Sequence, residues 1–356
     1  MKNIFFLFLA LTFLSVRIWA QDDPDNRKPV NIIIFVEEGV GMPVLTAAQS
    51  IKGKDLNLSK ASAVGMIKTS SANEVVTDPA ALGTAIACGI KTDNGIIGMN
   101  PKLQPVNNIF DLAKKKKKWV GIVTTSYVVD AVPAAFYAHQ PSASSYGNIA
   151  NDLINSGMSV FIGGGRKYFR LKGDSTTLFK ELNSNDYKIL EDYGDLKSRS
   201  HKKIAGLMCA DALPGIQNGR GEYLNLAWLR AFKTLIRNDT GYMLVIHDSH
   251  INWAAAKNDK NDMIEEILDM DSTLGQVLRY TAPDHKTLVL VIGGFETGGV
   301  TVLGNKFSKT DPNMKFSTKL RTASMVPVFA FGPSASLFSG IYENTDIYLK
   351  LKSLIE

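Results

Sequence analysis

The chain has 356 residues, of which 45% are hydrophobic and 21% charged, and this composition excludes a disordered or fibrous protein. Two cysteines are too few for a disulfide framework or a cysteine-based zinc site. The net charge of +6 allows acidic partners but is too small to indicate nucleic-acid binding.

The first 20 residues have the layout of a secretory signal peptide. Lys2 supplies a positive start, an apolar run extends from Ile4 to Val16, and Ile18 and Ala20 occupy the −3 and −1 positions of a cleavage site. The run is short for a membrane anchor, and no later segment is apolar enough to span a bilayer. We therefore expect an exported protein, periplasmic or secreted, with a flexible arm over residues 21–28 and a single domain over 29–356.

The remaining sequence alternates between buried strands and helices. Val30–Val36 is apolar except for Asn31, a pattern typical of a strand buried on both faces, and a helix-like stretch follows at Leu45–Ile51. One long helix is expected over 253–280. This alternation predicts an α/β domain with a largely parallel sheet, whose functional residues follow the strands. Further strands are expected at Trp119–Thr125, Ser159–Ile162, Tyr242–Ile246, Thr287–Ile292 and Val326–Phe331.

Three features allow two interpretations each. The lysine run 114–118 fits a polyanion site, but a solvated helix end, where cations suit the helix dipole, is the simpler reading. Gly163–Gly165, followed by Arg166 and Lys167, fits a phosphate cradle or a tight strand exit. Cys88 and Cys209 could pair after export, although the apolar surroundings of Cys88 favour a buried free thiol.

Several segments resemble the bacterial alkaline phosphatases in order and spacing. They include VNIIIFVEEGVG from Val30, SSANEVVTDPAALGTAIACGIKTDNGIIGM from Ser70, GIVTTSYVVDAVPAAFYAH from Gly121 and ETGG from Glu296. The resemblance implies a three-layer αβα sandwich around a large, mostly parallel sheet. It also implies phosphate-monoester hydrolysis through a serine nucleophile, two zinc ions, a magnesium ion and a phosphate-binding arginine.

The residues of that chemistry are missing at the matching positions. The family's nucleophile motif Thr-Asp-Ser-Ala falls on Thr77-Asp78-Pro79-Ala80, so Pro79, which has no hydroxyl, replaces the serine. Asp78 and Pro79 still suit a helix start, as N-cap and first helical residue. The phosphate-binding arginine falls on Ala143.

The family's metal-ligand positions are also degenerate. Zinc needs three or four N, S or O donors, and the matching residues do not supply them, so we expect neither zinc nor magnesium. We expect instead a residual polar site, in which Arg321 replaces a metal ion by pairing with Glu38 or Glu37. The metal-ligand positions hold Glu38, Asp130, Val132, His247, Asn252, Ala256, Gly294, Phe295 and Arg321, and the residual polar site comprises Glu38, Asp78, Asp130, His247, His250 and Arg321.

Two classes of function follow. The first is an inactive pseudophosphatase that binds an anionic or phosphorylated ligand, or pairs with an active relative. The resemblance also implies that the protein could form a homodimer. The alternative is a phosphomonoester hydrolase whose rebuilt zinc and magnesium site uses His247 and His250, with Asp93 and Glu296 as further ligands. A Ser-His-Asp hydrolase using Ser249 or Ser126 is a weaker variant, because neither serine lies in a nucleophile-elbow motif.

Overall fold

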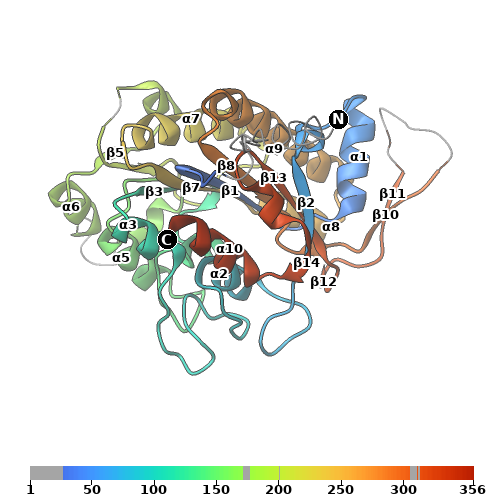
Figure 1. Ribbon diagram of the computed structural model, residues 1–356, viewed down its shortest axis with the longest axis horizontal. Helices are drawn as coiled ribbons and strands as arrows, with labels where there is room; N and C mark the ends of the chain where they lie inside the picture. The colour runs from blue at the N-terminus through green and yellow to red at the C-terminus, as the bar shows by residue number, and fades with distance from the viewer. Residues whose placement is uncertain (1–26, 171–176, 200, 305–310, 312) are drawn as a thin grey trace, which may run out of the picture.

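A ten-stranded sheet forms the centre of the protein (Figure 1). The computed structural model describes residues 27–170, 177–199, 201–304, 311 and 313–356, so the predicted signal peptide and most of the arm lie outside the described residues. The strand order is β14-β2-β13-β8-β1-β7-β3-β4-β6-β5, and within it β13 runs antiparallel to both of its neighbours. The strands are β1 (Asn31–Glu37), β2 (Ala63–Lys68), β3 (Trp119–Tyr127), β4 (Val160–Gly164), β5 (Lys188–Leu190), β6 (Ile204–Leu207), β7 (Tyr242–Asp248), β8 (Thr287–Ile292), β13 (Val326–Phe331) and β14 (Gly340–Glu343).

Strand β1 is the central strand, as its apolar sequence predicts. It pairs in parallel with β7 on one side and β8 on the other, and all seven of its residues are buried. Because helices cover both faces of a parallel sheet, each side chain of β1 enters one of two cores. The carboxyl ends of β1, β7 and β3 therefore meet at one edge of the sheet.

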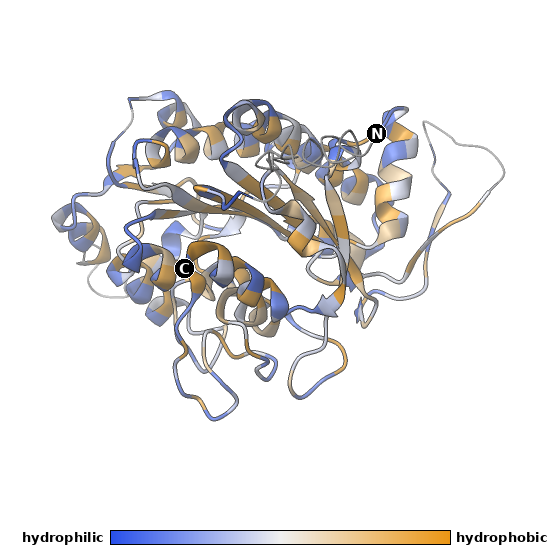
Figure 2. Ribbon diagram, viewed as in Figure 1, coloured by the Kyte–Doolittle hydropathy of each residue, from blue (hydrophilic) through white to orange (hydrophobic). Residues whose placement is uncertain are grey.

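Helices cover both faces of the sheet, which confirms the three-layer sandwich (Figure 1). Figure 2 shows hydrophobic residues concentrated in the sheet and hydrophilic ones on the outer helix surfaces. The first face carries α2 (Pro79–Cys88), α3 (Ile109–Lys115), α4 (Ala131–Ala134), α5 (Tyr146–Asn155), α6 (Thr177–Ser184) and α10 (Asp346–Ile355). The second face carries α1 (Met42–Lys52), α7 (Tyr223–Leu235), α8 (His250–Lys257) and α9 (Lys260–Thr281).

The single long helix predicted over 253–280 is wrong, because the segment forms two helices. Asn258 ends α8 in the left-handed conformation, with φ of 58°. Asp259 then begins α9 as its N-cap, accepting hydrogen bonds from the backbone N–H groups of Asn261 and Asp262. The break turns α9 back across the sheet while α8 stays at the carboxyl edge.

The glycine cluster after β4 is a tight strand exit and not a phosphate cradle. The N–H groups of Gly165 and Arg166 donate to the carbonyls of Asp211 and Cys209, at 2.9 and 3.0 Å. A Cβ at Gly164 would lie 2.1 Å from the Asp211 carbonyl, so this approach requires glycine. Cys88 is a buried free thiol, as its surroundings predict, and Cys209 is also unpaired.

Two short two-stranded sheets lie beyond the central sheet. They pair β9 (Glu296–Thr297) with β12 (Arg321–Thr322), and β10 (Val300–Val302) with β11 (Met314–Phe316). No helix within the described part of the chain is both long and apolar enough to cross a membrane.

Candidate functional site

The candidate site lies at the carboxyl edge of the sheet, where β1, β3 and β7 end. Glu38 follows β1 directly. His247 on β7 is the register partner of Val36 on β1 and of Thr124 on β3, so it lies close to the end of β1. Gly39 makes this approach possible, because a Cβ there would lie 2.7 Å from the Asn252 backbone and its φ is +91°. The end of β1 thus lies directly against α8.

Glu38 and His247 form a buried pair at the centre of the site. Both are almost fully buried, and His247 Nε2 lies 2.8 Å from Glu38 Oε1. The other ring nitrogen, Nδ1, lies 2.8 Å from Thr124 Oγ1. Burial raises the pKa of Glu38, and the hydrogen bond with His247 offsets only part of this rise. Burial lowers the pKa of His247, but its contacts with Glu38 outweigh that effect and the pKa is raised.

Neighbouring side chains complete this polar network. Ser249 Oγ lies 3.2 Å from Glu38 Oε1 and 3.3 Å from Asp130 Oδ2, so it links the two carboxylates. Asn252 Nδ2 donates to Glu38 Oε2 at 3.3 Å, and Ser126 Oγ donates to Asp130 Oδ2 at 2.6 Å. The carboxylates of Glu38 and Asp130, which could have bound a cation, therefore accept hydrogen bonds from the protein's own side chains.

Pro79 begins α2, where a serine nucleophile would stand in the resembling family. Asp78 is the N-cap: its Oδ1 accepts from Ala81 N at 2.8 Å and its Oδ2 from Gly95 N at 2.7 Å. Both oxygens of Asp78 thus serve the backbone, and the predicted helix start is confirmed. Asp78 is accordingly a helix cap and not a member of the Glu38 network, which corrects the residual site.

Ala143, at the position predicted to match the family's phosphate-binding arginine, has no side-chain donor for a phosphate group. Ala143 is half-buried, and its backbone N–H donates to the Gly95 carbonyl at 2.8 Å. A methyl side chain cannot replace the paired N–H donors with which a guanidinium binds oxyanions.

A cavity of about 530 Å³ opens beside this network, at one group of former zinc-ligand positions. Asn252, Ala256 and Arg321 all line it, together with Lys319 and Glu74. Asn252 is fully engaged, since its Oδ1 accepts from Thr297 Oγ1 at 2.8 Å. The cavity therefore presents two cations and one carboxylate.

The predicted ion pair of Arg321 with Glu38 or Glu37 is wrong. Arg321 forms no ion pair with any residue that the structure describes, and its guanidinium carbon lies 5.6 Å from the centroid of the Phe295 ring. Arg321 belongs to β12, which pairs with β9 and holds the side chain at the cavity wall. His247 fills the role that Arg321 was expected to take.

The remaining metal-ligand positions have become packing residues. Phe295 is fully buried in the core, and its carbonyl accepts from Gly39 N at 2.8 Å. Gly294 has φ of +63°, and a Cβ there would lie 3.0 Å from the Glu37 carbonyl. Val132 is fully buried, with its backbone packed so closely on α2 that a Cβ at Gly83 would lie 2.9 Å from Val132 Cα.

His250 lies apart from His247, which also corrects the residual site. The backbone N–H of His250 donates to Asp248 Oδ1 at 2.8 Å, and its ring packs against Trp253 with 4.6 Å between centroids. Its Nδ1 lies 3.9 Å from Glu266 Oε1, on the side of the sheet that α9 covers. The two histidines therefore cannot share one metal ion.

A second buried charge cluster lies on that face, and sequence reasoning missed it. Arg220 donates to Glu266 and, at 2.9 Å, to Asp269 Oδ2. Glu37 and Asp248 are register partners at the ends of β1 and β7, and neither carboxylate oxygen of Glu37 has a partner among the described residues. Burial, followed by the charge of Asp248, raises the pKa of Glu37 well above its ordinary value. Successive side chains of a strand point to opposite faces of the sheet, so Glu37 and Glu38 belong to different clusters. This alternation was the signal in the sequence from which the second cluster could have been predicted.

The geometry does not favour the alternative active sites. Ser249 Oγ lies 3.3 Å from the same ring nitrogen of His247 that contacts Glu38, whereas a catalytic triad uses opposite ring nitrogens for serine and carboxylate. Ser126 donates to Asp130 and is fully buried. No three Asp, Glu, His or Cys side chains in the described ranges are arranged to hold a metal ion. The donors present therefore do not fit zinc.

Comparisons with known proteins agree with the fold and the family. The family model described as alkaline phosphatase matches residues 29–316. Alkaline phosphatase 4 of Bacillus subtilis is 30% identical over 79% of this chain and 64% of its own length. The repressible alkaline phosphatase of Saccharomyces cerevisiae is 26% identical over 77% of this chain and 56% of its own length. This chain thus matches less than two thirds of either relative.

Solved structures give the same result over nearly the whole chain. The alkaline phosphatase of the Antarctic bacterium TAB5 has a TM-score of 0.86 and 33% identity, covering 93% of this chain and 98% of that one. A cold-active enzyme from Shewanella sp. has the same TM-score with 25% identity, covering 92% of this chain and 100% of that one. The sheet order, the motif positions and these likenesses together show that the chain belongs to the alkaline phosphatase family.

Proposed function

We propose that this protein is a pseudophosphatase: an exported member of the alkaline phosphatase family that does not hydrolyse phosphate esters and acts by binding. The observation that carries the proposal is Pro79 at the start of α2, where the phosphoryl group would be accepted. A proline has no oxygen to form a phosphoenzyme, so the covalent route lacks its first step.

The polar network supports the same conclusion independently. A two-metal phosphatase needs carboxylate and imidazole donors directed at its ions. Here Glu38 is engaged by His247, Ser249 and Asn252, and Asp130 by two serines. Self-contained hydrogen bonding of this kind offsets the repulsion between carboxylates without any cation.

The cavity beside Asn252 is the proposed binding site. Arg321 and Lys319 outnumber the single carboxylate of Glu74 in its lining, which also includes Ala256 and Thr297. An anionic or phosphorylated ligand suits this charge. A homodimer, or a complex with an active relative, is a further proposal that the resemblance supports, and export to the periplasm or medium follows from residues 1–20.

The test measures metal content and turnover in the same purified sample. We expect substoichiometric zinc and magnesium by elemental analysis, and no hydrolysis of an aryl phosphate after zinc and magnesium are added. An active alkaline phosphatase, stripped and reloaded in parallel, is the positive control. One zinc ion or more per chain together with metal-dependent turnover would reject the proposal and establish the phosphomonoester hydrolase reading.

A binding measurement completes the test. Phenyl phosphate or phosphoserine should raise the melting temperature of the wild-type protein, and Arg321→Gln should remove that shift. Lys286→Gln is the matched control, since it removes one exposed cation outside the cavity. Equal loss of the shift in both variants would contradict binding at this cavity.

A further inference from the structure

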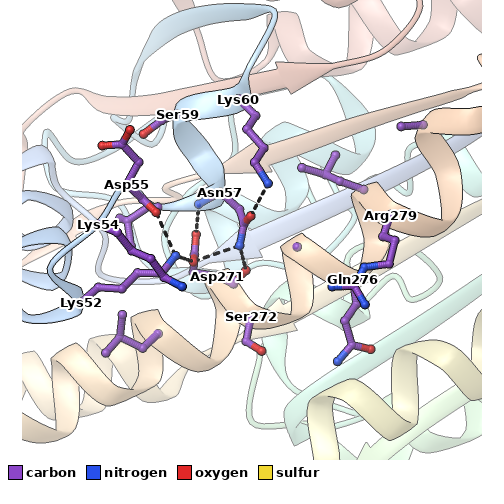
Figure 3. Close-up of a pocket in the computed structure, with 15 residues that line it drawn as sticks. Lys52, Lys54, Asp55, Asn57, Ser59, Lys60, Asp271, Ser272, Gln276 and Arg279 are labelled. Atoms are coloured by element: carbon purple, nitrogen blue, oxygen red, sulfur yellow. Dashed lines mark hydrogen bonds and ion pairs between the residues drawn. The ribbon is translucent and has the colours of Figure 1, made fainter.

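The cavity drawn in Figure 3 is lined by both basic and acidic side chains: Lys52, Lys54, Lys60 and Arg279 against Asp55 and Asp271. It measures about 1030 Å³ and lies between residues 52–60 and α9. The Asp271 carboxylate accepts from Lys52 Nζ at 2.5 Å and from Asn57 N at 2.6 Å. Asp55 adds a second acidic residue to the lining, so the cavity's lysines do not stand alone.

A smaller cavity, of about 420 Å³, contrasts with this one because its lining holds five lysines and no acidic residue. Lys114, Lys117 and Lys118 come from the lysine run, and Lys202 and Lys203 come from the segment that precedes β6. The cavity lies where β3, β4 and β6 begin, which is the edge of the sheet opposite the candidate site. The fold thus gathers two basic segments that are distant in sequence. We call this cavity the lysine cavity.

Backbone carbonyls hold three of these lysines in place. Lys118 Nζ donates to the Val30 and Thr240 carbonyls at 2.6 and 3.0 Å, and Lys203 Nζ donates to the Asn185 carbonyl at 3.0 Å. Lys114 Nζ donates to the Ser156 carbonyl at 2.7 Å and forms an ion pair with Asp111 at 3.0 Å. Carbonyl oxygens fix the ammonium groups without cancelling their charge, and among the described residues only Asp111 forms an ion pair with one of the five lysines.

The other two lysines, Lys117 and Lys202, are available to bind a ligand. The side chains of Lys117 and Lys202 form no hydrogen bond or ion pair with residues in the described part of the chain, and both are exposed. Gathered like charges of this kind raise the local concentration of anions. The volume lies within the range of small-molecule sites, roughly 300–1,000 Å³, so a small ligand fits better than a polymer.

We propose that the lysine cavity binds a small multivalent oxyanion. Ammonium groups act as point charges and do not demand the planar geometry that a guanidinium selects, so ligand charge should decide affinity. Phosphate-based and carboxylate-based anions share this chemistry, and pyrophosphate and citrate represent the two sources. The site is separate from the cavity beside Asn252 and does not depend on the proposed function.

The experiment is isothermal titration of the full mature chain with inorganic pyrophosphate, citrate and sulfate at low ionic strength. We expect pyrophosphate and citrate to bind more tightly than divalent sulfate. The double variant Lys117→Gln/Lys202→Gln should weaken pyrophosphate about 25-fold, at about 5-fold for each charge removed near the ligand. Its melting temperature should stay unchanged, because neither side chain has a hydrogen-bond or ion-pair partner among the described residues.

Two matched variants make the result specific. Lys54→Gln/Lys60→Gln removes the same charge at the cavity of Figure 3, and Arg321→Gln removes a cation at the candidate site. In a repeat titration at about 0.1 M ionic strength, where the Debye length is about 10 Å, Lys54→Gln/Lys60→Gln should change pyrophosphate affinity by less than about 2-fold. Arg321→Gln should remove only the binding that belongs to the candidate site and leave the binding at the lysine cavity. The proposal is overturned if pyrophosphate does not bind the wild type, if both lysine pairs weaken it equally, or if Arg321→Gln alone abolishes binding.

Discussion

Replacing His247 with alanine tests whether the buried pair with Glu38 holds the former metal pocket together. The change removes the contact at 2.8 Å to Glu38 and the contact at 2.8 Å to Thr124, both in the protein interior. Glu38 would keep only the weaker contacts from Ser249 and Asn252, at 3.2 and 3.3 Å.

The expected loss is large for a single residue. Removing one partner of a buried ion pair costs about 3–5 kcal/mol, because the remaining charge stays desolvated. We therefore expect His247→Ala to lower the free energy of unfolding by about 4 kcal/mol, and the melting temperature by about 8 °C at about 2 °C per kcal/mol. Glu38→Gln leaves no buried charge and should cost less than about 2 kcal/mol.

A double-mutant cycle gives the sharpest measurement. Urea unfolding of the wild type, Glu38→Ala, His247→Ala and the double variant should show a coupling energy of about 2 kcal/mol. Coupling near zero, or a loss below about 1 kcal/mol for His247→Ala, would refute the reasoning. The pocket would then depend on packing alone and not on the pair.

Three further predictions follow from the same geometry. A chelator should leave the melting temperature unchanged within about 1 °C, whereas a drop of several degrees would reveal a structural metal. Pro79→Ser should show no aryl phosphatase activity, because the arginine and metal donors stay absent; metal-dependent turnover in it would contradict the motif positions. The free energy of unfolding should fall between about pH 4.5 and 8, by about 1.4 kcal/mol per pH unit for each extra proton that the native state holds. Burial raises the pKa of Glu266 from 4.5 to about 8 and that of Glu37 well above 4.5, so the native protein binds protons there that the unfolded chain has already released. The protonated carboxyl groups stabilise the native state fully below pH 4.5, and this contribution is lost as the pH rises through their pKa in the native protein. Urea unfolding at three pH values tests the prediction. A free energy of unfolding that rises with pH over this range would contradict it.

The buried pair joins two positions that the resemblance assigns to metal ligands. Glu38 places a carboxylate where the family has a metal-binding aspartate, and His247 approaches it from β7. Because Thr124 holds the opposite ring nitrogen, the imidazole keeps one orientation. If the protein is the pseudophosphatase proposed above, hydrogen bonds and core packing occupy the positions that match the family's metal ligands, and His247 offsets the charge of Glu38.

Much of the fold was predictable because its signals are local. An apolar run such as Val30–Val36 permits only a strand buried on both faces, and the structure confirms it as β1. Asp78 followed by Pro79 predicts a helix start for the same reason, since capping involves only neighbouring residues. The break at Asn258 escaped prediction, because the apolar pattern continues across it while a single left-handed residue redirects the chain.

The sequence by itself indicated the family, and the resemblance predicts that the nucleophile and most metal donors are lost, because the residue type at a motif position does not depend on the tertiary structure. Only the tertiary structure decided which partners meet. Glu38 pairs with His247 and not with Arg321, because β1 and β7 are neighbours in the sheet while Arg321 belongs to β12, at the cavity wall. Lys117 and Lys202 share a cavity for a similar reason, since parallel strands bring their amino ends to one edge whatever their separation along the chain. Such contacts depend on strand order, which no short stretch of sequence encodes.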